Sequence, residues 1–470
     1  MSNGVRIEKD SLGTLAVPNS ALWGIHTERA LLNFPISGIQ LGTHRHLVRA
    51  LACVKKAAAL TNSRLGLIPA DIGQAIASAC DTVASGGVDH AFPIDVVQGG
   101  AGTSTNMNAN EVIANLALEL LGHARGSYEV VDPIGHVNKC QSTNDVYPTA
   151  VRLALVFAVE ELLDRLGLLS ASFAERGQAF ADIPKVGRTQ LQDAVPMTLG
   201  QEFTAFSVTL DEDHRRLGEA AGLLKECSLG ATAIGTGITA DPLYVKRVID
   251  TLSDVTGVRL VRARDFIEAT WDTGAFMTFS GTLKRTAIKL SKICSDLRLL
   301  SSGPQTGLAE IRLPPRQAGS SIMPGKVNPV IPEVINQIAF FVAGADLTVT
   351  MAADNGQLQL NAFEPAIAHA LLQSVSWLTN GCDVLRELCV TGVEANEALL
   401  RSRARASTGQ ATALLPFVGY TVAAGLAHRA LVSGRSVLEI AVNEGLLLPA
   451  EAEALMGPTS RMFSGEPACQ

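Results

Sequence analysis

Residues 155 to 173 read LVFAVEELLDRLGLLSASF and indicate the fold class of the chain. Within them, apolar residues recur at alternating steps of four and three, at Leu155, Val159, Leu162, Leu166, Leu169 and Phe173. This spacing keeps one apolar stripe of a helix against a partner along its whole length. We therefore expect a long bundle helix between Pro148 and Gly177.

Two further segments carry helical patterns. The first repeats apolar positions at Leu283, Ala287, Leu290, Cys294 and Leu297 and is followed by a Ser-Ser-Gly-Pro turn at residues 301 to 304. The second begins near Pro332, a residue suited to the first turn of a helix, and continues to about Ala353. It is apolar nearly all round, so we expect an oligomer in which copies of this region pack together.

The composition sets limits on the class of protein. A hydrophobic content of 47% with only 5% aromatic residues is typical of a helix-rich core of Ala, Leu, Val and Ile. The formal net charge of -7 gives no basic field for nucleic acid. The most apolar stretch, residues 338 to 353, is interrupted by Asp346, which argues against a membrane span. No secretion signal is visible, so we expect a cytoplasmic protein.

Metal and redox chemistry find little support in the sequence. The eight cysteines form no CxxC pair and are expected to be buried, reduced thiols. Among the nine histidines only His44 and His46 are close in sequence, and we interpret them as a surface pair in a loop. The sequence therefore predicts neither a metal site nor a cofactor.

The frequency of turn signals and the length of the helical patterns change along the chain, and these changes predict three domains. Residues 1 to 140 are broken by turn signals and are expected to form a separate, mostly helical domain. Residues 141 to 396 hold the long helical patterns and are expected to form the bundle. Residues 397 to 470 form a small helical domain with short helices at Ser436–Asn443 and Pro449–Met456.

Four polar islands interrupt the apolar background, at residues 99 to 110, 138 to 148, 187 to 196 and 319 to 329. Such islands cost core burial, so they usually serve ligands or helix caps. The first reads GGAGTSTN from residue 99, with glycines before hydroxyls such as that of Thr103 at a helix start, which favours an anion-binding corner. A plain capped helix start is the alternative. The lysine and hydroxyl that end a phosphate-binding loop are absent.

The second island places Ser142, Thr143 and Asn144 just before a long helix. Their side chains and backbone N–H groups can donate hydrogen bonds to a carboxylate. The alternative, capping by Ser142 or Asn144, is compatible with this role.

The third informative island is the run GSSIMPGKVNP at residues 319 to 329. Its glycines and paired serines describe a mobile loop that could close over a substrate. Ser320 is the candidate base, and Lys326 and nearby backbone N–H groups are the candidates for lowering its pKa. An ordinary flexible loop is the alternative.

Together these islands resemble the aspartase/fumarase superfamily, whose signature of paired serines, Met-Pro and Lys-x-Asn matches residues 319 to 329. The resemblance extends from HTERA at residues 26 to 30 to FVGY at residues 417 to 420. It implies an all-α subunit of three domains and a homotetramer with a core of about 20 long helices, five from each chain. It also implies active sites that combine residues from three subunits.

The branch of the superfamily is indicated by residues 138 to 145 and 187 to 194, which resemble aspartases more than fumarases. Fumarases have histidine where this chain has Gln190. Hydration of fumarate needs a group that takes a proton from water, and a carboxamide cannot titrate. Gly325 instead resembles fumarases, because many aspartases have alanine at this position. The resemblance therefore implies elimination of ammonia from L-aspartate, with fumarate hydration or lysis of a substituted aspartate as alternatives.

The same resemblance implies roles for individual residues in an anti β-elimination that passes through an aci-carboxylate. Ser320 removes the carbon-bound proton, and Lys326 assists. The remaining candidates bind substrate: Thr103, Ser142 and Thr143 the β-carboxylate, Thr189, Lys326 and Asn328 the α-carboxylate, and Asn144 and Gln190 the amino group. Arg29 is a weaker candidate for the carboxylate site, with a surface salt bridge as the alternative.

Overall fold

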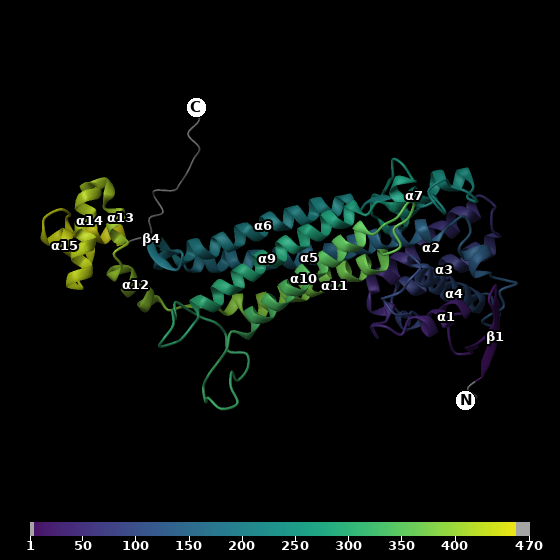
Figure 1. Cartoon of the computed structure of the whole chain (residues 1–470), viewed down its shortest axis with the longest axis horizontal. Coiled ribbons are helices and arrows are strands. Elements are labelled where there is room, and N and C mark those ends of the chain that lie inside the picture. Colours follow the sequence, from purple (N-terminus) through teal and green to yellow (C-terminus); the bar gives the residue numbers. More distant parts are fainter. Residues whose placement is uncertain (1–3, 457–470) are drawn as a thin grey trace. The chain divides into compact units, whose positions relative to one another are not determined.

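The computed structural model describes residues 4 to 456, which are mainly helical (Figure 1). The chain forms two compact units, each assembled from three segments. Unit 1 comprises Met1–Leu163, Arg215–Arg285 and Phe340–Leu378, and unit 2 comprises Asp164–His214, Thr286–Ala339 and Thr379–Gln470. The helical fold class is confirmed, while the three-domain division at residues 140 and 396 stays a prediction.

Unit 1 begins with an antiparallel hairpin in which Val5 lies opposite Pro18 and Asp10 opposite Gly13. The hairpin and the helices after it are β1 (Val5–Asp10), β2 (Gly13–Pro18), α1 (Ile25–Asn33), α2 (Arg45–Arg64), α3 (Ala70–Ala84) and α4 (Thr103–Leu120). A π-helical turn at Pro133–Val137 precedes the first long helix. Later segments of unit 1 are α7 (Pro242–Thr256), α8 (Glu268–Trp271) and the short parallel strands β5 (Glu226–Cys227) and β6 (Val261–Arg262).

Five long helices each run through both units: α5 (Thr143–Ala179), α6 (Leu199–Leu223), α9 (Gly274–Leu300), α10 (Val330–Asp354) and α11 (Glu364–Leu388). The apolar stripes expected on α5 and α9 are buried, with every stripe residue at most 2% exposed. In unit 2, rings of α5 and α6 pack edge to face, Phe173 against Phe206 with centroids 5.6 Å apart and Phe180 against Phe203 at 5.2 Å. These contacts confirm bundle helices.

The expected ends of α5 were wrong, because the helix starts before Pro148 and continues past Gly177. Pro148 lies early in the helix, where a missing N–H removes one bond that packing elsewhere can offset. At Gly177 a side chain would meet Thr204 of α6, since an added Cβ would lie 2.4 Å from its Oγ1. Glycine here permits close helix packing and does not end the helix.

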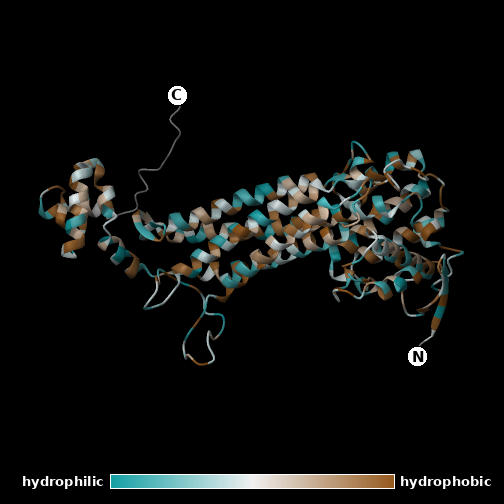
Figure 2. Ribbon diagram, viewed as in Figure 1, coloured by the Kyte–Doolittle hydropathy of each residue, from teal (hydrophilic) through white to brown (hydrophobic). Residues whose placement is uncertain are grey.

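Helix α10 is confirmed as an apolar helix. Among the described residues, it and α14 (Leu415–Ser433) are the two helices long and apolar enough to cross a membrane. Figure 2 shows hydrophobic residues along the long helices. Asp346 in the middle of α10 accepts hydrogen bonds from Ser280 and Lys284 of α9, as in a bundle helix. Helix α14 is interrupted at Gly419, which has φ 75° and ψ 167°, so neither piece approaches the roughly 20 residues of a span.

The C-terminal part of unit 2 is a cluster of short helices around buried residues such as Leu414, Leu426 and Val437. The remaining elements of this unit are β3 (Pro184–Thr189), β4 (Gln192–Thr198), β7 (Ile311–Arg312), β8 (Glu394–Ala395), α12 (Glu397–Ala406), α13 (Gln410–Ala413), α15 (Val437–Asn443) and α16 (Pro449–Met456). Ser436 and Glu439 form a reciprocal cap on α15. The two short helices expected in this region are therefore confirmed.

Candidate active site

The first polar island ends at the start of α4, and its backbone is shaped by left-handed residues at Gly100, Ala101 and Gly102. A side chain at Gly102 would collide with Tyr147 of α5, because an added Cβ would lie 2.4 Å from Cγ of that ring. Gly102 therefore lets the N-terminus of α4 come close to α5. Thr103, the first residue of α4, is exposed, and its hydroxyl donates to the carbonyl of Gly100 over 2.8 Å.

The second island forms the N-terminus of α5, where Ser142, Thr143 and Asn144 are half-buried. The Ser142 hydroxyl accepts from the Asn144 N–H at 3.3 Å, so the expected cap is present. The Asn144 carboxamide donates to the carbonyl of Ala233 at 2.7 Å, which leaves its oxygen available to an ammonium group. Asn106 of α4 donates to Thr143 Oγ1 at 3.1 Å and links the starts of α4 and α5.

Two helix N-termini with hydroxyl side chains thus meet in unit 1. The partial positive charge of each helix end and the free N–H groups favour an anion. The starts of α4 and α5, which carry Thr103, Ser142, Thr143 and Asn144, therefore lie together, and their free N–H groups suit a carboxylate.

Asp145 is a structural residue of this group to which the sequence analysis assigned no role. One of its carboxylate oxygens accepts from the Ser142 N–H, and the other accepts from the Gly230 and Thr232 N–H groups at 2.8 and 3.2 Å. Burial raises the pKa of Asp145 to about 6, although these bonds and Lys55 oppose the rise. Asp145 thereby holds the glycine-rich segment 230 to 237 against α5. In the sequence, the glycines of that segment were the signal from which its close contact with α5 could have been expected.

The island at residues 187 to 196 forms the β3–β4 hairpin of unit 2, whose two-residue turn is Gln190 and Leu191. Both have positive φ, 53° and 63°, the conformation of a tight hairpin turn that asparagine and glycine usually occupy. Thr189 and Gln190 are exposed at this turn. Such strain is often retained where a side chain must be held in one direction, which agrees with a ligand role for Gln190.

The base of this hairpin is fixed by buried charges. Glu310 accepts from Arg188 at 2.6 Å and lies 3.1 Å from the Lys185 ammonium. Burial would raise the pKa of Glu310, but Arg188 and Lys185 outweigh it and hold the pKa below its ordinary value. The Ser407 hydroxyl donates to Asp193 of β4 at 3.1 Å. These contacts hold the turn on a rigid support.

The serine loop, residues 319 to 329, is closed on itself in unit 2. The Gly319 N–H donates to the Lys326 carbonyl at 2.7 Å, and the Asn328 carboxamide donates to the Gly319 carbonyl at 2.9 Å. The hydroxyl oxygen of Ser320 accepts from the N–H groups of Ile322 and Met323 at 3.2 and 3.0 Å. The loop therefore holds the Lys326 backbone and the Asn328 carboxamide against Gly319, the residue before Ser320.

Two kinds of group were expected to act on the Ser320 oxygen, the backbone N–H groups and the Lys326 ammonium, and only the first contacts it in this structure. Backbone N–H groups are aimed at its oxygen, where they would stabilise an alkoxide. The ammonium of Lys326 is exposed and forms no ion pair or hydrogen bond within residues 4 to 456.

Arg29 is occupied by a carboxylate of its own unit. Its guanidinium donates to both oxygens of Asp10, at 2.7 and 2.9 Å. The hydrogen bond from Arg29 holds the pKa of Asp10 at about 2. This geometry favours the salt-bridge alternative for Arg29.

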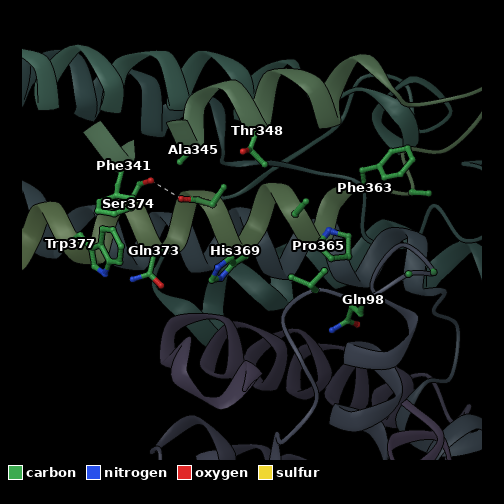
Figure 3. Close-up of a pocket in the computed structure, with 16 residues that line it drawn as sticks. Gln98, Phe341, Ala345, Thr348, Phe363, Pro365, His369, Gln373, Ser374 and Trp377 are labelled. Carbon is green, nitrogen blue, oxygen red and sulfur yellow. Dashed lines mark hydrogen bonds between the residues drawn. The ribbon is translucent and has the colours of Figure 1, made fainter. Parts of the chain in front are cut away.

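A cavity of about 630 Å³ lies in unit 1 beside the first island, lined by α10, α11 and residues 97 to 100 (Figure 3). Its walls are mainly apolar, with Phe341 and Trp377 in edge-to-face contact at 5.1 Å. His369 lines the cavity, and its Nδ1 lies 2.9 Å from Nε2 of His44. The surface interpretation of His44 was therefore wrong, because tertiary packing supplies a partner far away in sequence.

Metal ligands are not gathered in the described part of the chain, where no group of three or more His, Cys, Asp or Glu side chains could hold an ion. Seven cysteines lie among the described residues and all are free, six of them buried. Cys469 lies outside those residues.

Comparisons with known proteins cover nearly the whole chain. Residues 13 to 344 match the family model described as Lyase, and residues 411 to 461 match the one described as Fumarase C C-terminus. The chain is 56% identical to the aspartate ammonia-lyase of Pseudomonas aeruginosa over 443 residues, 94% of each chain. It is 50% identical to that of Escherichia coli over 464 residues, 98% of this chain and 97% of the other.

Solved structures agree with this similarity. A protein of Brucella melitensis described as fumarate lyase:delta crystallin, bound to cobalt, is 54% identical with a TM-score of 0.93, over 96% of this chain and 98% of the other. A class II fumarase of Schistosoma mansoni is 33% identical with a TM-score of 0.92, over 98% and 99%.

Proposed function

Because the chain belongs to the aspartase/fumarase superfamily of lyases, we propose that it is an aspartate ammonia-lyase, which converts L-aspartate reversibly to fumarate and ammonia. One observation carries the proposal: the chain is 50 to 56% identical to curated aspartate ammonia-lyases over 94 to 98% of its length. Identity to the solved fumarase is lower, at 33%, which disfavours fumarate hydration.

The difficult step of this reaction is removal of a proton from the carbon beside the β-carboxylate. The resulting intermediate carries two negative charges on one carboxyl group, so stabilising that charge dominates the barrier. In our proposal Thr103, Ser142 and Thr143 bind the β-carboxylate and bind more strongly as its charge grows. Support comes from their position at two helix N-termini in unit 1.

Ser320 acts in the proposal as the carbon-acid base, supported by the two backbone N–H groups that point at its oxygen. Thr189, Lys326 and Asn328 hold the α-carboxylate, with the free ammonium of Lys326 supplying positive charge when the loop closes. Asn144 and Gln190 orient the amino group. Anti elimination then breaks the carbon–nitrogen bond, and ammonia leaves with its electron pair.

We propose a homotetramer in which each active site combines residues from three subunits. Support comes from α10, on which Phe340, Phe341, Leu347 and Met351 are each at least 60% exposed in the single chain. Exposed apolar surface of this extent marks an interface. Light scattering tests the assembly, and a mass four times that of one chain is expected.

The proposal needs no metal or other cofactor, and its substrate is a small dicarboxylate, without nucleic acid or membrane. We place the enzyme in the cytoplasm. The seven free cysteines of the described residues accord with a reducing compartment.

A paired assay tests the function. Fumarate formation is measured spectrophotometrically with L-aspartate and with L-malate, at equal enzyme and substrate concentrations. Turnover with L-aspartate and none above background with L-malate is expected. Malate as the better substrate would make the protein a fumarate hydratase, and turnover only with a substituted aspartate would make it a related lyase.

A further inference from the structure

Lys55 of α2 is fully buried, at 0% exposure, and its ammonium forms no ion pair with a carboxylate of residues 4 to 456. Its ammonium donates to two carboxamide oxygens, Asn138 Oδ1 at 2.8 Å and Gln141 Oε1 at 3.0 Å. Burying a charge is costly, and an apolar side chain would pack a helix at less cost. A charge retained here therefore points to a task other than packing.

Asn138 is the centre of the surrounding network. Its Oδ1 also accepts from Asn106 Nδ2 and Asn110 Nδ2, each at 3.2 Å, while its own amide group donates to the Gln141 carbonyl at 3.1 Å. The Lys55 Nζ donates to this oxygen, so the hydrogen bond requires the oxygen of Asn138 to face Lys55. Lys55 thereby fixes which way the Asn138 carboxamide points.

The orientation of the Asn138 carboxamide determines the orientation of the Asn106 carboxamide. Because Asn138 presents an oxygen, Asn106 must present its amide N–H groups, and these reach both Asn138 Oδ1 and Thr143 Oγ1. The oxygen of Asn106 is buried without a hydrogen-bond partner within the described structure. Leaving it so is unfavourable, which indicates that the neighbours impose the orientation.

The last step concerns the proton of Thr143. Its hydroxyl oxygen accepts a hydrogen bond from Asn106, and a hydroxyl has a single proton to donate. With that oxygen occupied on the protein side, the proton is directed to a ligand at the α4–α5 corner. We propose that Lys55 is a positioning residue that acts through Asn138 and Asn106 to make Thr143 a donor to the substrate's β-carboxylate. The proposal rests on the proposed function.

In this proposal Lys55 acts on the substrate through the Thr143 hydroxyl, and a hydrogen bond to an anion strengthens as the negative charge of its acceptor grows. Burial lowers the pKa of Lys55 to about 7, and the nearby Asp145 carboxylate opposes this. The contribution of Lys55 should grow as the carboxylate becomes a dianion. Removal of Lys55 should therefore lower kcat more than it changes KM.

Lys55→Met tests the proposal, because methionine keeps the length and removes the charge and donors. We expect kcat with L-aspartate to fall by about tenfold or more, since removing an oxyanion donor outright costs about 100-fold. KM should change by less than about threefold. Lys56→Met is the matched control: the neighbouring lysine pairs with the exposed Asp81 at 2.6 Å, and its removal should leave both constants unchanged.

A double variant distinguishes positioning from a structural role. In a Thr143→Val background, Lys55→Met should cost no further activity, because the hydroxyl it positions is gone. Losses that multiply, or an unchanged kcat in folded Lys55→Met, would overturn the proposal. If Lys55→Met does not fold, Asn106→Leu takes its place: it removes the donor to Thr143 and should lower kcat equally, and an unchanged kcat would again overturn it.

Binding of the nitronate of 3-nitropropionate gives a readout that is independent of turnover, because its planar group with two negatively charged oxygens resembles the aci-carboxylate. Calorimetry should show about tenfold weaker nitronate binding to Lys55→Met than to the wild type, and succinate binding changed by less than about threefold. Equal nitronate affinities would overturn the positioning role. A wild type that neither deaminates L-aspartate nor binds the nitronate would instead overturn the proposed function.

Discussion

Replacement of Ser320 by alanine separates the proposed chemistry from the stability of the serine loop. The Ser320 oxygen accepts two hydrogen bonds, from the N–H groups of Ile322 and Met323. Both of those residues are exposed, so water can replace the lost acceptor. We expect the free energy of unfolding to fall by less than about 1 kcal/mol.

The expected effect on catalysis is much larger. A positioned base contributes up to about 10⁴-fold to a rate, which corresponds to about 5.4 kcal/mol in the barrier. Ser320→Ala should therefore lose detectable turnover. Substrate binding should stay within about tenfold, roughly 1.4 kcal/mol, because Ser320 holds neither carboxylate in the proposed mechanism.

The assay follows fumarate formation at saturating L-aspartate, with calorimetry for substrate binding and light scattering for the tetramer. Ser321→Ala is the matched control, since this adjacent serine is exposed and should keep kcat within about twofold. Turnover of Ser320→Ala within about tenfold of the wild type, in an intact tetramer, would refute the assignment of the base.

Three other substitutions test particular features. Gly102→Ala should lower the free energy of unfolding by about 3 kcal/mol, because φ is +88° and the new Cβ would strike Tyr147; an unchanged melting temperature in a thermal scan would contradict this. Burial and His369 lower the pKa of His44 to about 4, so His44 takes up its proton at lower pH in the folded chain than in the unfolded one. Wild-type stability should rise with pH between about 4 and 6.5, and His44→Asn should flatten that rise in urea unfolding; equal slopes would argue against the pair. Gly325→Ala, at φ +82° with open space around it, should cost about 1 kcal/mol of loop strain and change kcat/KM by less than about fivefold; a loss above 100-fold would mean that glycine is essential for loop closure.

Local signals were sufficient for the buried stripes of the long helices and for the start of α4. The four-three spacing from Leu155 to Phe173 predicts a buried stripe, and every residue of it is buried. Glycines followed by hydroxyls predict the start of α4, which begins at Thr103. These features depend on neighbours within one or two turns, which the sequence displays directly.

Contacts between distant segments could not be predicted in this way. The His44–His369 pair joins residues 325 positions apart, and the cap that Asp145 provides for Thr232 spans 87. Gly177 has the usual signature of a helix end, yet its missing side chain serves the packing of α6 against α5. Sequence spacing carries no information about such partners, because each depends on how the chain folds back.

The sequence by itself determined the helical class and the family, and it supplied the candidate residues at 103, 142 to 144 and 319 to 329, since each of these rests on short-range periodicity or on a contiguous motif. Only the tertiary structure decided how those residues are held: that Arg29 is occupied by Asp10, and that backbone N–H groups face Ser320. It also decided that Lys55 lies buried in a network of carboxamides that extends through Asn138 and Asn106 to Thr143. The physical reason is that a side chain's direction, burial and donor or acceptor role are set by partners that only folding brings within hydrogen-bonding distance.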